Sequence, residues 1–222
     1  MICRDFIHVG ICDTGEGIIR NALQNYVRAP NGDRNAEMIP FLKGHQQAHM
    51  PLSMMRQWSD APAFTSVRNP FDWYISHYLH HLKNKKVEMP WSDWFPRHRG
   101  EFTKEWQHMT NVNGKEGVAY IFKFENMESG LAETLSILSP KKLTQAYVLS
   151  WFPDAYRQWC NRPWIEGIEQ WLRYDLYTET QREAVESIDG WALERWDYSF
   201  YDVYDFPKAS QDSTVPMDGR EL

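Results

Sequence analysis

The segment at residues 5–29, DFIHVGICDTGEGIIRNALQNYVRA, decides the fold that this sequence predicts. A short apolar run at residues 5–9 leads into a glycine-rich loop at residues 10–17, after which apolar side chains recur near helical spacing. This order is typical of a β-strand, a tight loop and an α-helix. The start of a helix presents free backbone N–H groups and the positive end of its dipole, which suit an anion. The alternative is a plain turn that glycine permits.

Strand and helix signals continue to alternate along the chain. Apolar runs predict strands at residues 38–43, 63–67 and 118–124, and helices at residues 130–138, 154–160, 164–176 and 179–196. Such alternation favours an α/β fold, a three-layer parallel sheet with helices on both faces. Ligands of these sheets bind at the carboxyl ends of the strands. The glycine loop, Gly44-His45 and Arg68-Asn69-Pro70 are therefore expected to converge there.

A helix is expected to begin at Pro70, because Asn69 is a good N-cap and proline a good first helical residue. Apolar residues then recur at helical spacing and mark one buried face: Phe71, Ile75, Tyr78 and Leu82. Residues 83–117 are polar, rich in tryptophan and broken by proline and glycine, so they predict an irregular excursion with short helices. Its Trp91, Trp94 and Trp106 would form either core or an aromatic wall beside an acceptor.

The composition indicates one folded domain. The chain has 222 residues, of which 42% are hydrophobic and 15% aromatic, enough to fill a core. We expect a single domain over residues 1–207 and a flexible tail at residues 208–222. The formal net charge of −6 argues against a nucleic-acid partner. An anionic ligand would need a few placed cations and backbone amides.

We also expect a cytoplasmic protein with no membrane partner. No apolar run is long enough for a transmembrane helix, and charged residues interrupt the N-terminal segment, unlike in a signal peptide. The three cysteines, Cys3, Cys12 and Cys160, are widely spaced, which favours reduced thiols over a disulfide framework or a zinc site. An aromatic, acidic surface helix would suit a homodimer.

The glycine loop, GICDTGEG, has the G-x4-G spacing of a Walker A loop between Gly10 and Gly15. A Walker A loop continues with Lys and then Ser or Thr, but here Glu16 and Gly17 follow. The lysine that binds the β- and γ-phosphates and the hydroxyl that holds Mg²⁺ are both missing. An ordinary ATPase or GTPase is therefore not expected.

A second anion signal lies in SVRNPFDWYISHY. Arg68 comes at a strand end, and Ser76 lies on the second turn of the following helix. A guanidinium can bind a phosphate through two hydrogen bonds, and a nearby hydroxyl can donate to the same group. The alternative is a surface arginine and a helix serine with no ligand.

Four segments, in order, resemble the sulfotransferase superfamily, especially its shorter bacterial and carbohydrate-type branches. FIHVGICDTGEGIIRNAL resembles the family's first strand and 5′-phosphosulfate loop, and KGHQQAHMPL its Gly-His segment. FTSVRNPFDWYISHY resembles the 3′-phosphate signature, and AYIFKFENM a later strand of the family. The likeness covers about residues 5–135, with a weaker echo in YDLYTETQREAV and WDYSFYDV.

The resemblance implies a P-loop-like sulfotransferase architecture and 3′-phosphoadenosine 5′-phosphosulfate (PAPS) as donor, with no metal. Arg68 and Ser76 would bind the 3′-phosphate. The loop would surround the 5′-phosphosulfate through Asp13, Thr14, Gly15, Glu16, Gly17 and Ile18. The protein would transfer a sulfuryl group to a hydroxyl or amine of a small-molecule or carbohydrate acceptor, by in-line displacement.

The loop departs from the family at its cation. Asp13 stands where the family has a lysine that neutralises the leaving phosphate, and Glu16 adds a second negative charge. Either Arg20, Lys43 or another cation substitutes, or activity is weak or lost. Two alternatives follow: a catalytically impaired nucleotide-binding or interaction protein on the same fold, and, with less support, a P-loop kinase.

The best candidate for the catalytic base is His45, which matches the family's Gly-His element; His49 would share its face if that segment is helical. The alternative for His45 is a hydrogen-bonded structural histidine, and His8 is expected to be structural. Glu125, at a strand end, would be a base or a helix cap.

His77 and His81 have i, i+4 spacing, so a metal pair is conceivable. No third ligand is apparent from the sequence, which favours a solvated or packed face, with no metal.

Overall fold

The computed structural model describes residues 1–3, 5–27, 49–85, 89–141, 143–153 and 176–202 of the chain. Three strands, β1 (Ile7–His8), β2 (Ala63–Val67) and β5 (Tyr120–Lys123), form a parallel sheet in the order β1-β2-β5. Ile7 pairs with Ala63, and Phe64 pairs with Tyr120. The described part of the chain is therefore a mixed α/β fold around a small parallel sheet, as its alternating pattern predicts.

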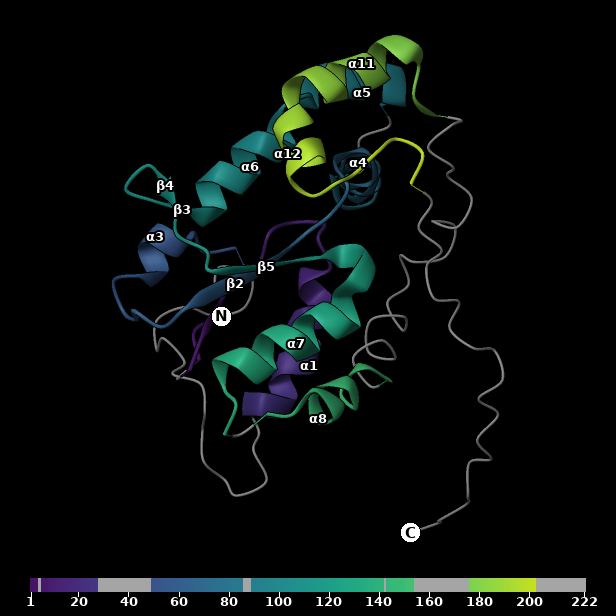
Figure 1. The fold of residues 1–222 in the computed structure, drawn as a ribbon. Helices are drawn as coiled ribbons and strands as arrows, with labels where there is room; N and C mark the ends of the chain where they lie inside the picture. The colour runs from purple at the N-terminus through teal and green to yellow at the C-terminus, as the bar shows by residue number, and fades with distance from the viewer. Residues whose placement is uncertain (4, 28–48, 86–88, 142, 154–175, 203–222) are drawn as a thin grey trace, which may run out of the picture.

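Helices follow the strands. Their bounds are α1 Glu16–Val27, α3 Leu52–Met55, α4 Pro70–Lys85, α5 Trp91–His98, α6 Glu101–Thr110, η1 Phe124–Asn126, α7 Met127–Leu138, α8 Gln145–Leu149, α11 Glu179–Ile188 and α12 Gly190–Arg195. Helices α1 and α7 lie on one side of the sheet and α4 and α6 on the other (Figure 1).

The two faces of β2 explain this layering. All five residues of β2 are buried, and successive side chains of a strand point to opposite faces. Ala63 and Val67 belong to the same buried cluster as Phe71 of α4, whereas Phe64 belongs to a second cluster with Ile19 of α1. A strand that is buried on both faces needs helices on both, and burial of its apolar side chains stabilises the sheet.

Helix α4 begins as predicted. Asn69 Oδ1 accepts a hydrogen bond from the backbone N of Phe71 at 3.1 Å, and Pro70 is the first helical residue. Phe71, Ile75 and Tyr78 are buried on one face and Leu82 is partly buried beside them. The residue pattern around Asn69 therefore predicted both the start and the buried face of α4.

Residues 83–117 are more regular than predicted. They contain α5, α6 and a hairpin of β3 (Asn111–Val112) with β4 (Lys115–Glu116). Asn113 and Gly114 in the turn both have positive φ, 52° and 77°, as a tight two-residue hairpin requires.

The excursion's Trp91, Trp94 and Trp106 are 7%, 2% and 2% exposed, so they form core. An aromatic wall open to an acceptor is therefore the wrong one of the two alternatives for these side chains.

Two predicted helices have different bounds in the structure. The helix expected at 130–138 begins three residues earlier, so Gly130 lies inside it. A Cβ at this position would lie 2.6 Å from Phe122 Cβ, which explains the glycine. The helix expected at 179–196 is divided into α11 and α12 at Asp189. Asp189 is buried at this break, where its carboxylate accepts hydrogen bonds from Tyr74 at 2.8 Å and Thr103 at 2.6 Å.

Several predicted elements lie outside the residues that the structure describes. They are the strand at 38–43, Gly44-His45, the helix at 154–160, nearly all of the helix at 164–176 and the tail at 208–222. Within the described ranges, the helices are too short or too polar to cross a lipid bilayer.

Candidate functional site

The loop after β1 and the junction between β2 and α4 meet at the carboxyl ends of the two strands. Arg68 Nη1 donates to the backbone O of Asp13 at 3.2 Å. Ser66 Oγ donates to the backbone O of Thr14 at 2.7 Å, and Thr65 Oγ1 donates to the backbone O of Val9 at 2.7 Å. The structure therefore brings together the two segments in which the sequence indicated an anion site.

The glycine loop has an unusual backbone. Asp13 and Gly15 have positive φ values of 61° and 79°. A Cβ on Gly15 would lie 2.6 Å from Phe124 Cε2 and 2.9 Å from Met127 Cε, so only glycine fits against the start of α7. This close approach sets the position of the loop over the end of the sheet.

The residues that begin α1 offer backbone groups more than side chains. The carbonyl of Gly15 accepts from the backbone N of Ile18 at 3.0 Å and of Ile19 at 3.1 Å, which starts the helix. Thr14, Gly17 and Ile18 are buried, and Thr14 Oγ1 donates to the carbonyl of Ile11 at 2.9 Å.

Glu16, the first residue of α1, lies 3.5 Å from Arg20 Nη1. Arg20, one of the cations proposed to replace the missing lysine, is thus paired with Glu16 of the same loop. Lys43, the other candidate, lies outside the described residues.

The side chain of Arg68 is held from two sides. Its guanidinium carbon lies 4.7 Å from the centroid of the Phe124 ring, a cation–π contact, and its Nη1 donates to Asp13. Phe124 in turn packs against Gly15. Arg68 is thus fixed at the junction of the loop, β2 and the start of η1.

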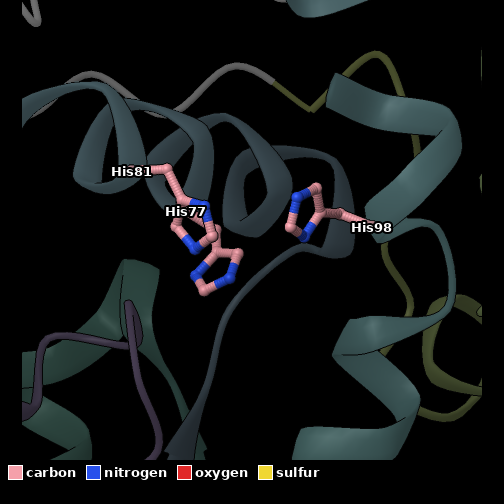
Figure 2. A group of neighbouring side chains, drawn as sticks. All are labelled: His77, His81 and His98. Atoms are coloured by element: carbon pink, nitrogen blue, oxygen red, sulfur yellow. The ribbon is translucent and has the colours of Figure 1, made fainter. Parts of the chain in front are cut away.

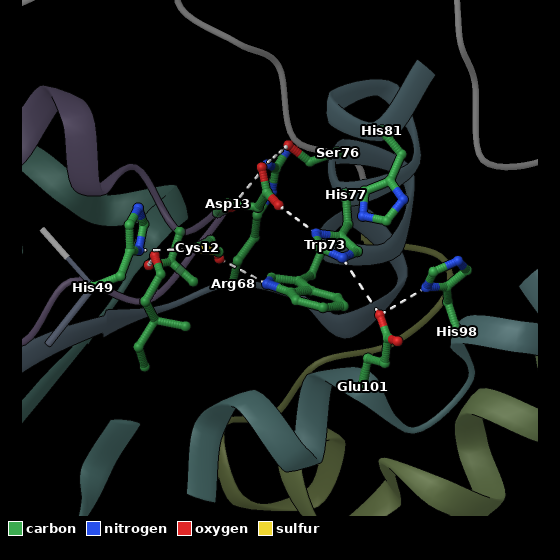
Figure 3. Close-up of polar contacts among 12 residues, drawn as sticks. Cys12, Asp13, His49, Arg68, Trp73, Ser76, His77, His81, His98 and Glu101 are labelled. Carbon is green, nitrogen blue, oxygen red and sulfur yellow. Dashed lines mark hydrogen bonds and ion pairs between the residues drawn. The ribbon is translucent and has the colours of Figure 1, made fainter. Parts of the chain in front are cut away.

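Asp13 places a carboxylate where the sequence predicted a phosphate. Ser76 Oγ donates to Asp13 Oδ1 at 3.2 Å, and His77 Nδ1 lies 2.9 Å from Asp13 Oδ2 (Figure 3). The hydroxyl and the guanidinium that the resemblance assigns to the 3′-phosphate therefore both contact Asp13, one at its carboxylate and one at its carbonyl. The sequence alone did not indicate this contact, because 63 residues separate Asp13 from Ser76.

Glu125 stabilises the β2–α4 junction. Its carboxylate accepts from the backbone N of Asn69 at 3.1 Å and from Tyr198 Oη at 2.6 Å. Burial, together with this carboxylate, raises the pKa of the Tyr198 hydroxyl. The capping role predicted for Glu125 is thus confirmed, although the helix it caps is α4 and not the helix that follows it.

The candidate bases differ in their surroundings. His45 lies outside the described residues. His49 Nδ1 lies 3.3 Å from Cys12 Sγ, but burial, with Glu105 nearby, raises the pKa of the Cys12 thiol. This pair is therefore not an activated thiolate. His8 is 2% exposed and stacks on Phe64, and burial holds its pKa well below the usual range, as expected of a structural histidine.

A third histidine joins the pair on α4. One ring nitrogen each from His77, His81 and His98 lie within 4.8 Å of one another (Figure 2). His98 comes from the last residue of α5, and Glu101 from the first residue of α6 lies 2.9 Å from its Nδ1. His98 is therefore a third histidine beside His77 and His81, which the sequence alone did not indicate. The signal was missed because His98 lies in the excursion that the sequence did not place.

Neither the scan against protein-family models nor the search of curated proteins found a match for this chain. The likeness to the sulfotransferase superfamily therefore stays a prediction from four sequence segments.

Proposed function

We propose that this chain is a sulfotransferase-like protein that binds PAPS between the β1–α1 loop and the β2–α4 junction. It would transfer the sulfuryl group to a hydroxyl or amine of a small-molecule or carbohydrate acceptor. The observation that supports this proposal is the hydrogen bond from Arg68 to the carbonyl of Asp13, which joins the two predicted phosphate-binding segments.

The chemistry would be an in-line displacement at sulfur. The acceptor oxygen or nitrogen forms a bond to sulfur while the bond from sulfur to the 5′-phosphate oxygen breaks, so the nucleotide leaves as 3′-phosphoadenosine 5′-phosphate. The acceptor proton goes to a base, for which His45 is the candidate from sequence. The protein's contribution would be positioning and stabilisation of the leaving negative charge.

The backbone amides at the start of α1 and the Arg68 guanidinium suit that charge. The carboxylate of Asp13 does not, since like charges repel at close range. Donor binding at Ser76 would require this carboxylate to give up its hydrogen bond from Ser76.

The second candidate is a catalytically impaired protein that binds the nucleotide or a partner at the same place. The contact between Asp13 and Ser76 favours it, because an acid of the chain holds the hydroxyl meant for the phosphate. Losing one stabilising charge contact costs on the order of 10²–10³ in rate, enough to leave binding without turnover.

Calorimetric titration with 3′-phosphoadenosine 5′-phosphate, and in parallel with ATP–Mg²⁺, tests the donor site. We expect the former to bind and Arg68→Ala to weaken binding at least about 30-fold, because an arginine hydrogen-bonded to phosphate is removed. Arg195→Ala is the matched control: Arg195 pairs with Glu116 on the surface, so binding should not change.

No binding of the nucleotide by the unmodified protein would exclude the donor site. Equal losses in Arg68→Ala and Arg195→Ala would place the nucleotide elsewhere. A sulfuryl-transfer assay over a panel of hydroxyl and amine acceptors then separates the two candidates: turnover supports the enzyme, and binding without turnover supports the impaired protein.

A further inference from the structure

The histidine cluster consists of His77 and His81 on one face of α4 and His98 at the end of α5, with Glu101 beside it (Figure 2). The ligand nitrogens lie within 4.8 Å of one another. Four ligands around a tetrahedral zinc ion, each about 2.0–2.1 Å from the metal, lie roughly 3.4 Å apart. Small side-chain rotations would therefore bring these nitrogens onto one ion.

The rings are held in place by packing. His77 stacks on Trp73 at a centroid distance of 4.6 Å, and His98 stacks on Trp94 at 4.2 Å. Both tryptophans are buried. Side chains fixed in this way lose little conformational freedom when a ligand binds, which increases affinity.

Hydrogen bonds orient two of the rings. An ionised carboxylate only accepts, so His77 donates Nδ1–H to Asp13 Oδ2 at 2.9 Å and, in its neutral form, keeps Nε2 as a lone-pair donor. A carboxylate behind a ligand histidine is the usual outer partner of a zinc site. His81 Nδ1 accepts from Trp94 Nε1 at 3.3 Å, so a neutral His81 carries its proton on Nε2, and zinc would bind Nδ1 in place of this hydrogen bond.

Glu101 completes the donor set. Its Oε2 lies 3.4 Å from His77 Nε2 and 2.9 Å from His98 Nδ1 (Figure 3). The lone pair of a neutral His77 Nε2 would face this negative oxygen, a repulsion that a cation between the two atoms would remove. The side chains of His77 and His98 are 18% and 19% exposed, so an ion from solvent can reach them.

We propose that His77, His81 and His98 bind one Zn²⁺ ion, with Glu101 as fourth ligand and Asp13 as the outer partner of His77. Imidazole-rich sites select zinc and its neighbours in the first transition row, whereas Mg²⁺ prefers oxygen ligands. This inference does not depend on the proposed sulfuryl transfer. It makes Asp13 a shared residue, since the same carboxylate contacts Ser76.

The test uses untagged full-length protein, freed of metal with EDTA and desalted. Zinc is titrated in competition with a chromophoric chelator, and Co²⁺ is added separately to record the visible absorption of a tetrahedral site. We expect one equivalent of zinc per chain, and affinity at least about 100-fold weaker in His81→Gln and in His98→Gln. Mg²⁺ should not compete.

His80→Gln is the matched control, because His80 is the exposed neighbour of His81 on α4. It should bind zinc like the unmodified protein. Glu101→Gln, at a partly exposed position, should weaken binding about 10-fold without loss of fold, which covers the case in which a histidine variant fails to fold. No stoichiometric zinc binding, or equal losses in His80→Gln and His81→Gln, would overturn the proposal.

Discussion

Asp13 Oδ1 accepts a hydrogen bond from Ser76 Oγ at 3.2 Å, across 63 residues of sequence. The contact places a negative charge of the chain beside the hydroxyl that the resemblance to sulfotransferases assigns to a phosphate. Asp13 Oδ2 contacts His77 on the same helix at 2.9 Å. One loop residue therefore connects the proposed donor site to the proposed zinc site.

Asp13→Asn should tighten binding of 3′-phosphoadenosine 5′-phosphate about 10-fold. The amide removes a charge that repels the phosphate, and asparagine tolerates the positive φ of 61° at this position. Calorimetry measures the change. Asp60→Asn, which removes an exposed aspartate of equal charge, should have no effect. Weaker binding in Asp13→Asn would show that the carboxylate helps to hold the nucleotide.

Gly15→Ala should destabilise the fold by about 2–4 kcal/mol, since it adds a left-handed backbone penalty to a steric clash with Phe124 at 2.6 Å. Gly114→Ala isolates the backbone penalty. Gly114 has nearly the same φ, 77°, and no atom within 4 Å of an added Cβ, so we expect a loss of about 1–2 kcal/mol. Urea unfolding measures both. Equal losses would mean that Phe124 moves aside without cost.

The stability of the protein should fall as the pH drops below about 6.5, the ordinary histidine value. Burial holds the pKa of His8 well below that value in the folded state, so the unfolded chain binds a proton that the folded chain does not. The free energy of unfolding should then change by up to about 1.4 kcal/mol per pH unit from this one group.

Urea unfolding between pH 5 and 8, with EDTA present, measures this slope. His8→Leu should reduce it by the equivalent of one proton, whereas His80→Leu, at an exposed position, should leave it unchanged. An unchanged slope in His8→Leu would assign the pH dependence to other groups.

Cys3 and Cys12 should resist alkylation in the folded protein. Burial raises the pKa of Cys3 to about 12 and also raises that of Cys12, so little thiolate is present at pH 8. In a Cys160→Ser background, iodoacetamide should react at least about 1000-fold more slowly with folded than with urea-unfolded protein. Mass spectrometry of the labelled peptides follows each thiol. Rapid labelling of Cys12 in the folded protein would contradict the inference that the Cys12 thiol beside His49 is unreactive.

Local sequence patterns predicted much of the fold, because they act over a few residues. The short run AFTSV gave the bounds of β2, and Asn69-Pro70 gave the start of α4. The pair Asn113-Gly114, in the turn between β3 and β4, is a hairpin signal of the same local kind. The break between α11 and α12 at Asp189 was not predicted, and it coincides with hydrogen bonds from Tyr74 and Thr103, which are distant in the sequence.

The sequence by itself determined the order β1, α1, β2, α4, β5 and α7, the glycine loop and the two segments with residues suited to an anion. Only the tertiary structure decided that Asp13 contacts Ser76, that Phe124 closes on Gly15, and that His98 joins His77 and His81. Hydrophobic period and capping are local properties that neighbouring residues set. Contacts between residues many positions apart depend on how helices pack on the sheet, which no local pattern encodes.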